Sequence, residues 1–366
     1  MKKFTSAINK NLLAICLGLI SACVLEAAPR PGYRQINLVS DENGNALHSD
    51  GRLINPWGLA VWGEGIWVAD NGTGESTVYN RGGHPYALTV NISALAGSTN
   101  PSTPTGIALN QTTAFVITNG NRHAPARFIY VTEDGTILAY NPDVDRQNAA
   151  IMVDNSGSGA IYKGVAIAGN TNATAVYAAN FHTGAIDVYD DHFHFVKSFT
   201  DPNLPPGFAP FGIRRIHGKL FVTYAKQSAT SGGDDEAGPG NGYIDIFDLD
   251  GTVLRQFAAQ GALNSPWGLA VAPTHFGKFS HALLVGNFGD GRINAYDLIT
   301  GQFLGALSDD KGVPIVISGL WGLSFEREPS GAFFDFEAAR LFFTSGPGDE
   351  SHGLFGYLQS NNPLGN

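Results

Sequence analysis

A six-residue segment recurs along this 366-residue chain and limits the folds that the chain can adopt. The segment PWGLAV at Pro56–Val61 returns letter for letter at Pro266–Val271. Four weaker copies begin at Pro104, Tyr162, Pro210 and Leu320. The glycine at the third position of each copy lies 48 to 58 residues from the next one. The chain is therefore built from six repeats of about 50 residues, a period typical of β-propeller blades.

The pattern inside the repeats predicts strands rather than helices. A helical solenoid requires apolar residues at a 3.6-residue period, whereas these segments alternate with period two. The 46 glycines, 19 prolines and 15% charged residues are typical of many short strands joined by turns. We predict an all-β fold, a six-bladed β-propeller with about four strands in each blade. No linker interrupts residues 29–366, which we interpret as one domain.

Two repeats depart from the regular pattern. In the second, Arg127–Tyr140 predicts a hairpin that turns at Asp134-Gly135, and this leaves Ala114–Thr118 either as a surplus strand or as part of an extended hairpin with the first strand. In the fourth, the acidic, glycine-rich segment Lys226–Asn241 replaces a tight turn. We interpret that segment as a surface loop rather than as part of a site.

The ends of the chain predict how the ring closes. The sixth repeat ends with a strand at Gly353–Tyr357, and only nine residues follow it, a proline-containing and mostly polar segment that is poor in strand formers. Near the other end, Arg34–Ser40 alternates polar and apolar residues and has no hairpin partner beside it. We predict that this N-terminal strand pairs antiparallel with Gly353–Tyr357 and completes the last blade, because closure protects the edges of a propeller.

Residues 1–28 have the form of a signal peptide. Three lysines precede the apolar run Leu12–Ala22, which is too short to span a bilayer. The sequence Ile20-Ser21-Ala22-Cys23 resembles the lipobox of bacterial lipoproteins, which would make Cys23 the lipidated N-terminus; ordinary cleavage nearby is the alternative. We expect an exported protein, either secreted or held in the periplasm or cell envelope. A possible lipid on Cys23 is the only membrane attachment that we expect.

Charge and cysteine content exclude several classes of function. Cleavage before Cys23 leaves 19 basic and 32 acidic residues, a net charge of −13. Such a chain is a poor partner for nucleic acid or for an anionic membrane surface. No cysteine follows Cys23, so the folded domain holds neither disulfides nor thiolate metal sites. We expect a monomer that binds a small molecule, a glycan or a protein.

Specific motifs carry a family resemblance. The pattern PxGLAV…WVADN…GRINAYD resembles the blade consensus of NHL-type propellers. More closely, the chain resembles an uncharacterised family of bacterial secreted propeller proteins. The motifs that carry this likeness are NLVSD at Asn37–Asp41, NPWGLA at Asn55–Ala60, LNSPWGLAVAP at Leu263–Pro273 and LLVGNFGDGRINAYD at Leu283–Asp297. The resemblance implies the fold and export, and it implies no activity.

One face of the predicted ring gathers the candidate ligand-binding residues. Loops that enter the first strand and loops that join the second and third strands emerge together around the central channel. Trp57, Trp267 and Trp321 share one position in three repeats, and Lys163 holds the same position in another. The tryptophans can either fill the gaps between blades or form a stacking surface for a sugar or another flat ligand. We take these four residues as the candidate ligand site.

A metal site at the same face is a second hypothesis. Asn71, Asn180 and Asn287 occupy one equivalent position, and Asp134 holds it in a fourth repeat. Converging amide and carboxylate oxygens suit Ca²⁺; capping of turns by the same side chains is the alternative. Six-bladed lactonases of the senescence-marker and paraoxonase groups hold such a cation. Where the senescence-marker-like enzymes carry an acidic ligand, this chain has Asn55, which argues against a lactonase.

Recognisable catalytic motifs are missing from the sequence. His182 and His352 lie in loops of the same face and are the candidate acid–base residues, although a loop histidine is more often simply solvated. The sequence has no nucleophile elbow, zinc-protease pair or phosphate-binding loop. We therefore expect a non-catalytic propeller that binds a ligand or a protein through its loop face. The alternative is a divalent-cation-dependent hydrolase or lyase at the central channel.

Overall fold

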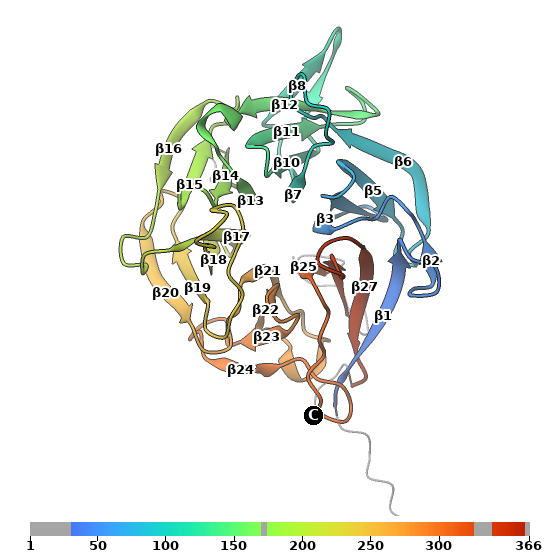
Figure 1. Ribbon diagram of the computed structural model, residues 1–366, viewed down its shortest axis with the longest axis vertical. Helices are drawn as coiled ribbons and strands as arrows, with labels where there is room; N and C mark the ends of the chain where they lie inside the picture. Colours follow the sequence, from blue (N-terminus) through green and yellow to red (C-terminus); the bar gives the residue numbers. More distant parts are fainter. Residues whose placement is uncertain (1–30, 170–173, 326–338, 363–366) are drawn as a thin grey trace, which may run out of the picture.

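The chain forms a ring of β-sheets around a central channel (Figure 1). The computed structural model describes residues 31–169, 174–325 and 339–362. Within these ranges the regular elements are strands, apart from two short 3-10 turns, η1 (Ser156–Ser158) and η2 (Gly277–Phe279). The predicted all-β propeller is confirmed. The predicted signal peptide and the proposed lipid site at Cys23 lie outside the described residues.

The strands group into six four-stranded units, which we call blades 1 to 6 and whose strands we call A to D from the channel outwards. Blade 1 contains β3 (Pro56–Trp62), β4 (Gly65–Asp70), β5 (Glu75–Tyr79) and β6 (Pro85–Ile92). Blade 2 contains β7 (Pro104–Leu109), β10 (Phe128–Thr132), β11 (Thr136–Tyr140) and β12 (Asn148–Asp154). Blade 3 contains β13 (Tyr162–Gly169), β14 (Thr174–Asn180), β15 (Ala185–Tyr189) and β16 (Phe195–Phe199).

The remaining blades follow the same order. Blade 4 contains β17 (Phe208–Ile216), β18 (Lys219–Lys226), β19 (Gly242–Phe247) and β20 (Val253–Ala259). Blade 5 contains β21 (Pro266–Val271), β22 (Leu283–Asn287), β23 (Ile293–Tyr296) and β24 (Phe303–Ala306). Blade 6 contains β25 (Leu320–Phe325), β26 (Arg340–Ser345), β27 (Leu354–Ser360) and β1 (Tyr33–Ser40). A two-residue parallel pairing of β6 with β12 joins the sheets of blades 1 and 2.

The glycine of each repeat explains why the segment recurs. A Cβ on Gly212 would lie 2.2 Å from the Trp267 carbonyl oxygen, and a Cβ on Gly268 would lie 2.5 Å from that of Trp321. A Cβ on Gly322 would in turn lie 2.6 Å from the Trp57 carbonyl oxygen. Each A strand therefore packs its glycine against the backbone of the next A strand, which only a residue without a Cβ permits.

The N-terminal strand closes the ring, as predicted. β1 pairs antiparallel with β27 in a register that places Tyr33 opposite Ser360 and Ser40 opposite Leu354. A two-residue strand, β2 (His48–Ser49), then pairs parallel with the end of β1. The buried residues Leu38 and Val39 belong to a core cluster that spans blades 6 and 1. The two ends of the chain thus share one blade (Figure 1).

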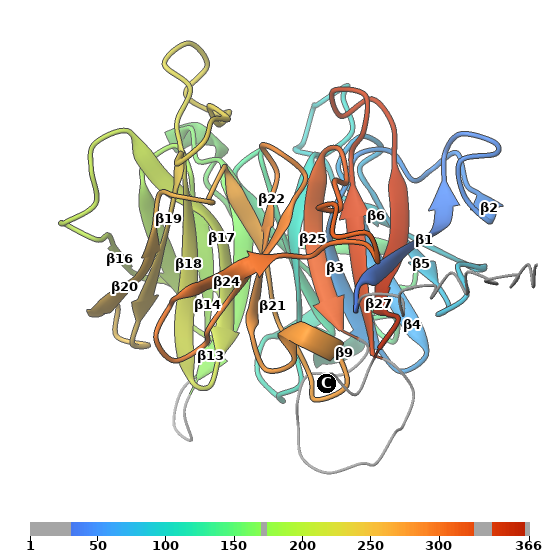
Figure 2. The same cartoon turned by 90° about the horizontal axis from the view of Figure 1, so that it is seen from below.

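The two irregular repeats have distinct structures. The surplus segment of blade 2 forms a separate hairpin of β8 (Val116–Asn119) and β9 (Arg122–Pro125), which projects from the ring (Figure 1). In blade 4 the connection between β18 and β19 rises on the same face as the connection between β26 and β27 (Figure 2). Both connections supply acidic side chains to the channel mouth, as described below.

Candidate functional site

Aromatic side chains fill the centre of the ring. Each A strand is irregularly paired next to the residue that precedes its glycine, and such bulges redirect side chains. The residues at this position include Trp57, Phe211, Trp267 and Trp321, which form one buried cluster with Phe181. We call these five residues the aromatic plug.

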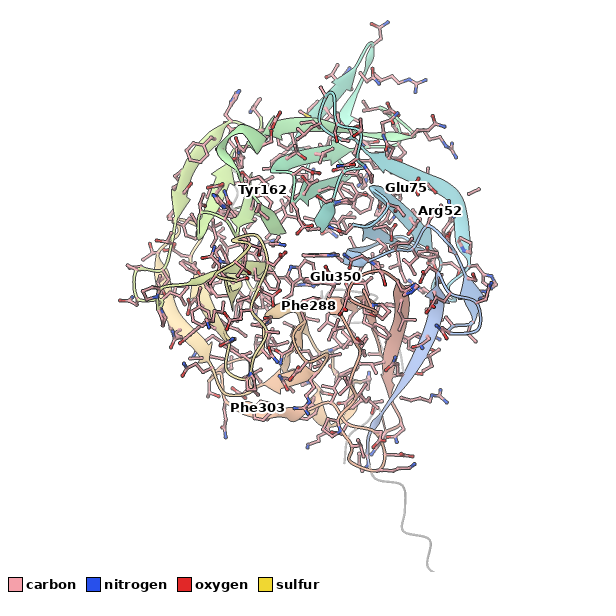
Figure 3. The ribbon with its side chains drawn as sticks, viewed as in Figure 1. Arg52, Glu75, Tyr162, Phe288, Phe303 and Glu350 are labelled. Carbon is pink, nitrogen blue, oxygen red and sulfur yellow. The ribbon has the colours of Figure 1, made fainter. Side chains whose placement is uncertain are left out.

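The plug leaves little of its tryptophan surface open to a ligand. Trp57 stacks on Trp321 with ring centroids 3.4 Å apart, and Phe288 stacks on Trp321 at 4.0 Å. Trp57 and Trp321 are only 2% and 1% exposed. The geometry therefore favours the interpretation of these tryptophans as packing residues. Phe288 is only partly buried, so its ring is more exposed to solvent than those of Trp57 and Trp321. It lies near Glu350 at the centre of the ring (Figure 3).

Lys163 is the only cation among the six residues that precede the repeat glycines. Its side chain is 3% exposed, and its Nζ donates a hydrogen bond to Glu133 Oε1. The same ammonium lies 5.0 Å from the centroid of Trp57 and 5.8 Å from that of Phe181. A buried ammonium requires a charged partner, and Glu133 in the β10–β11 turn provides it.

A chain of hydrogen bonds ties this ion pair to the neighbouring blades. Asn71 Nδ2 donates to Glu133 Oε2 (2.9 Å), and Asn55 Nδ2 donates to Asn71 Oδ1 (3.2 Å). Trp321 Nε1 donates to Asn55 Oδ1 (3.2 Å). Residues of blades 1, 2, 3 and 6 are thereby held in one network, which fixes the position of Lys163.

Two further acids approach this ion pair from long connections. Glu350, from the β26–β27 connection, lies at the channel (Figure 3). Its pKa is raised to about 7, chiefly by burial and then by the negative charge of Glu133, while Lys163 opposes the shift. Asp235, from the β18–β19 connection, also has a raised pKa, caused mainly by burial and partly offset by Ser265 and Lys163. Asp235 Oδ2 is buried and has no hydrogen-bond partner among the described residues.

The backbone that presents Glu350 is strained. Asp349 and Glu350 have φ values of +52° and +65°, in the left-handed region that non-glycine residues rarely adopt. Each such residue costs about 1 kcal/mol or more, and residues of this kind are concentrated at functional sites. The strain is consistent with a turn shaped to hold Glu350 over the channel.

Sequence reasoning found Lys163 but missed the three acids around it. Glu133 directly precedes Asp134, which was preferred because it stands at the predicted turn. Glu350 lies two residues before His352, and Asp235 lies in the segment that was interpreted as a surface loop. The interpretation of that segment as a surface loop stays a prediction, although its Asp235 is partly buried and lies close enough to Glu350 to raise the pKa of that carboxyl group. The sequence offered one clue to Glu133 and Glu350, which is that each lies within two residues of a candidate residue. The alternation of apolar residues in strands says nothing about which side chain of a loop faces the channel.

The residues of the calcium hypothesis mostly use their oxygens within the fold. Asn71 Oδ1 accepts from Asn55, and Asp134 Oδ2 accepts from Ser102 Oγ and the Thr103 amide. Asn180 Oδ1 accepts from the backbone amides of Ile161, just before β13, and Thr183, just after β14. Among the described residues, Asn287 Oδ1 is the one oxygen of these four side chains that is buried without a hydrogen-bond partner. This arrangement does not fit a ring of calcium ligands at the channel.

The two candidate histidines occupy different surroundings. His352 Nδ1 lies 2.8 Å from Asp41 Oδ2, and the hydrogen bond to Asp41 raises the histidine pKa. It therefore connects the start of β27 to the loop after β1. His182 is exposed beside Gly159. The described residues show no contact between these two histidines, and a joint catalytic role stays a prediction without geometric support.

A concavity occupies the half of the channel away from Lys163. It has a volume of 820 Å³ and is lined by the inner strands and by residues near their far turns, including Arg214, His217 and Glu64. Trp267 of the aromatic plug forms part of its wall. The plug thus separates this cavity from the acidic mouth around Lys163.

Comparison of the sequence with known proteins shows its family. Uncharacterized protein R648 of Acanthamoeba polyphaga mimivirus is 36% identical over 329 residues, which are 88% of this chain and 78% of that protein. Uncharacterized protein L690 of the same virus is 35% identical over 331 residues, 88% of this chain and 84% of that protein. The chain belongs to the family of these proteins. Its matched relatives are viral rather than bacterial, which corrects that part of the resemblance, and no family model matches the sequence.

Solved structures support the fold alone. A Bacteroides thetaiotaomicron protein of unknown function has a TM-score of 0.55 at 9% identity, over 90% of this chain and 76% of that one. Streptogramin B lyase has a TM-score of 0.50 at 10% identity, over 90% of this chain and 97% of the lyase. Within the described ranges, no helix has the length and apolar character that a membrane span requires.

Proposed function

We propose that this protein is a non-catalytic propeller that binds a small organic cation at the channel mouth. The observation that carries the proposal is an imbalance of charge around Lys163. The lysine pairs with Glu133, whereas Glu350 and Asp235 face the same region with no cationic partner of their own in an ion pair among the described residues. A bound cation would relieve the repulsion that these acids exert on one another.

The chemistry of the mouth favours an amine or quaternary ammonium over an anion. An anionic ligand would have to displace Glu133 from Lys163 and would then lie beside Glu350 and Asp235. A cation instead meets two carboxyl groups and the half-buried ring of Phe288. Aromatic faces attract ammonium groups by about 0.5 to 2 kcal/mol, depending on desolvation. Asp235 Oδ2, buried and unpartnered in the described structure, provides a hydrogen-bond acceptor for a primary amine.

The experiment compares charged ligands with neutral ligands of the same shape. Choline is tested against 3,3-dimethyl-1-butanol, and putrescine against 1,4-butanediol, by titration calorimetry. We expect the cations to bind at least about tenfold more tightly, and Glu350→Gln to reduce that affinity about tenfold, as expected for the loss of one charge-assisted contact. Glu64→Gln is the matched control, because Glu64 belongs to the opposite cavity. Equal binding of charged and neutral ligands, or no binding of either cation, would refute the proposal.

A second candidate function rests on Glu350 alone. A carboxyl group with a pKa of about 7 beside a lysine has the properties of a general acid–base catalyst at neutral pH. This candidate keeps the hydrolase or lyase alternative but assigns the chemistry to Glu350 instead of a divalent ion. A screen of ester, lactone and lyase substrates with wild-type protein and Glu350→Gln tests it. Turnover that rises or falls around pH 7 and disappears in the variant is the expected result.

We also propose that the protein is exported. The support is the lysine-flanked apolar run before Cys23 and the absence of cysteine from the rest of the chain. Fractionation of cells that express the full chain tests export directly.

A further inference from the structure

A buried group of oxygen atoms between blades 3 and 4 is independent of the channel mouth. Asp245 on β19 is 0% exposed, and neither of its carboxylate oxygens has a hydrogen-bond partner among the described residues. Asp201, which follows β16 and is 8% exposed, lies close enough to act on it: burial, and then the charge of Asp201, raise the pKa of Asp245 to about 8. Tyr224 on β18 is 1% exposed, and its hydroxyl is likewise without a partner in the described structure.

The sheet register places these groups on one face. Val222 is opposite Asp245, and Tyr224 is opposite Tyr243. Tyr224 and Asp245 are therefore diagonal neighbours on adjacent strands, a relationship that separates Cβ atoms by about 7 Å and leaves room between the functional groups. Tyr224 and Tyr243 pack in a cluster with residues of blade 3, so this face points toward Asp201.

The neighbouring blade shows what a satisfied aspartate looks like at the same position. Asp187 opposes Ala178 on β14 as Asp245 opposes Val222 on β18. Three donors reach the carboxylate of Asp187: Tyr162 Oη at 3.1 Å, Asn180 Nδ2 at 2.9 Å and Ser198 Oγ at 2.5 Å.

In blade 4 every one of these donor positions has changed. By register, Tyr224 takes the place of Asn180, Gln256 that of Ser198, and Pro210 that of Tyr162. Tyr224 and Gln256 carry donors, but neither forms a hydrogen bond to Asp245 in the described structure, and Pro210 has no side-chain donor. The carboxyl group of Asp201 adds another acceptor nearby.

We propose that Asp201, Asp245 and Tyr224 form a binding site for a hard cation, Ca²⁺ above all. Two carboxyl groups and a hydroxyl supply oxygen ligands only, the donor type that Ca²⁺ prefers, and backbone carbonyls can complete its coordination. Two adjacent buried carboxylates without a cation would repel each other strongly in a medium of low dielectric constant. An ion here would fasten blade 3 to blade 4, because Asp201 lies on the connection between them.

Thermal denaturation of chelator-treated protein at pH 8.5, with and without CaCl₂, tests the site. A calcium concentration 100 times the Kd should raise the melting temperature by about 4 °C for a chain of this length. Asp245→Asn should lose this response, and without calcium it should melt at a higher temperature than the wild type because one buried charge is removed. If that variant fails to fold, Asp201→Asn replaces it.

A surface cluster provides the control. Asp190, Asp191 and His192 bring their ligand atoms within 4.8 Å of one another in a partly exposed turn of blade 3. Asp190→Asn should keep the calcium response of the wild type. Loss of the response in Asp190→Asn, or its persistence in Asp245→Asn, would overturn the proposal. So would a wild type that does not respond to calcium at pH 8.5 while Asp245→Asn is more stable, because the two carboxyl groups then share a proton instead.

Discussion

Truncation of Leu38 is the sharpest test of the ring closure. Leu38 lies in β1 at an irregularity in the pairing with β27, between the pairs Asn37–Gly356 and Val39–Phe355. Its side chain is 2% exposed, and its Cβ is 2.9 Å from the position that a Cβ on Gly83 of blade 1 would take. Leu38 therefore packs across the junction between the last blade and the first.

The expected loss of stability follows from this burial. Replacing a fully buried leucine with alanine costs about 3 kcal/mol, from lost transfer free energy and from the cavity that remains. With an unfolding entropy of about 2 cal/mol/K per residue, this loss lowers the melting temperature of the ring by about 4 °C. Because β1 joins blade 6 to the start of the chain, the whole ring should unfold in one weakened transition.

Urea denaturation followed by tryptophan fluorescence measures the effect, since Trp57, Trp267 and Trp321 report on the ring centre. The control is Val196→Ala on β16, whose side chain is 54% exposed, and we expect it to change stability by less than about 0.5 kcal/mol. The reasoning is refuted if Leu38→Ala matches the control. It is also refuted if Leu38→Ala produces a separate early transition that leaves the tryptophan signal intact.

Four other predictions follow from individual contacts. Gly212→Ala places a Cβ 2.2 Å from the Trp267 carbonyl oxygen and should destabilise the fold by about 3 kcal/mol in urea titrations; an effect below about 0.5 kcal/mol would contradict the packing of adjacent A strands. Glu350 has a pKa raised from 4.5 to about 7, so stability should fall as the pH rises through this range. Glu350→Gln should escape that fall and gain up to about 3 kcal/mol on the wild type between pH 4 and pH 9; parallel pH profiles would count against it. The hydrogen bond to Asp41 raises the pKa of His352, so protonated His352 stabilises the fold below its usual pKa of 6.5. This stabilisation is lost as the pH rises through the raised pKa of His352 in the folded protein. The melting temperature of His352→Ala should therefore differ from that of wild type more at pH 5.5 than at pH 9, and a constant difference would be inconsistent with this role. Cys23→Ser should move the protein from the membrane fraction to the soluble one, and unchanged fractionation and mass would argue against a lipid.

The channel mouth also predicts how ligand affinity depends on pH. If ionised Glu350 binds the cation about tenfold more tightly than the protonated group, the affinity for choline should rise about fivefold between pH 6 and pH 8, because the group has a pKa of about 7. In Glu350→Gln the affinity should not change across this range. A profile that is equally steep in the variant would assign the effect to another group.

Most of the architecture could be predicted from local pattern. The alternation of apolar residues and the repeated PxG segment predicted the strands and the ring. They could do so because every blade packs its first strand against the next blade through a glycine at the same position. Arg34–Ser40 could be paired with the end of the chain because it was an amphipathic strand without a neighbour, and the last repeat was one strand short. The structure confirms this pairing, from Tyr33 opposite Ser360 to Ser40 opposite Leu354.

The site was beyond the reach of local pattern, for a physical reason. Lys163 was found because it breaks the pattern of its repeat, but Glu133, Asp235 and Glu350 lie in connections whose sequences carry no periodicity. Whether these acids lie close to Lys163, and how far burial raises their pKa values, depends on which connections come together above the channel. Asp187 and Asp245 make the same point: the sequences AIDVY and YIDIF are nearly alike. The sequence determined the ring because neighbouring residues suffice to encode strands and turns. Only the tertiary structure decided which aspartate has donors, because those donors come from other strands and from the adjoining blade.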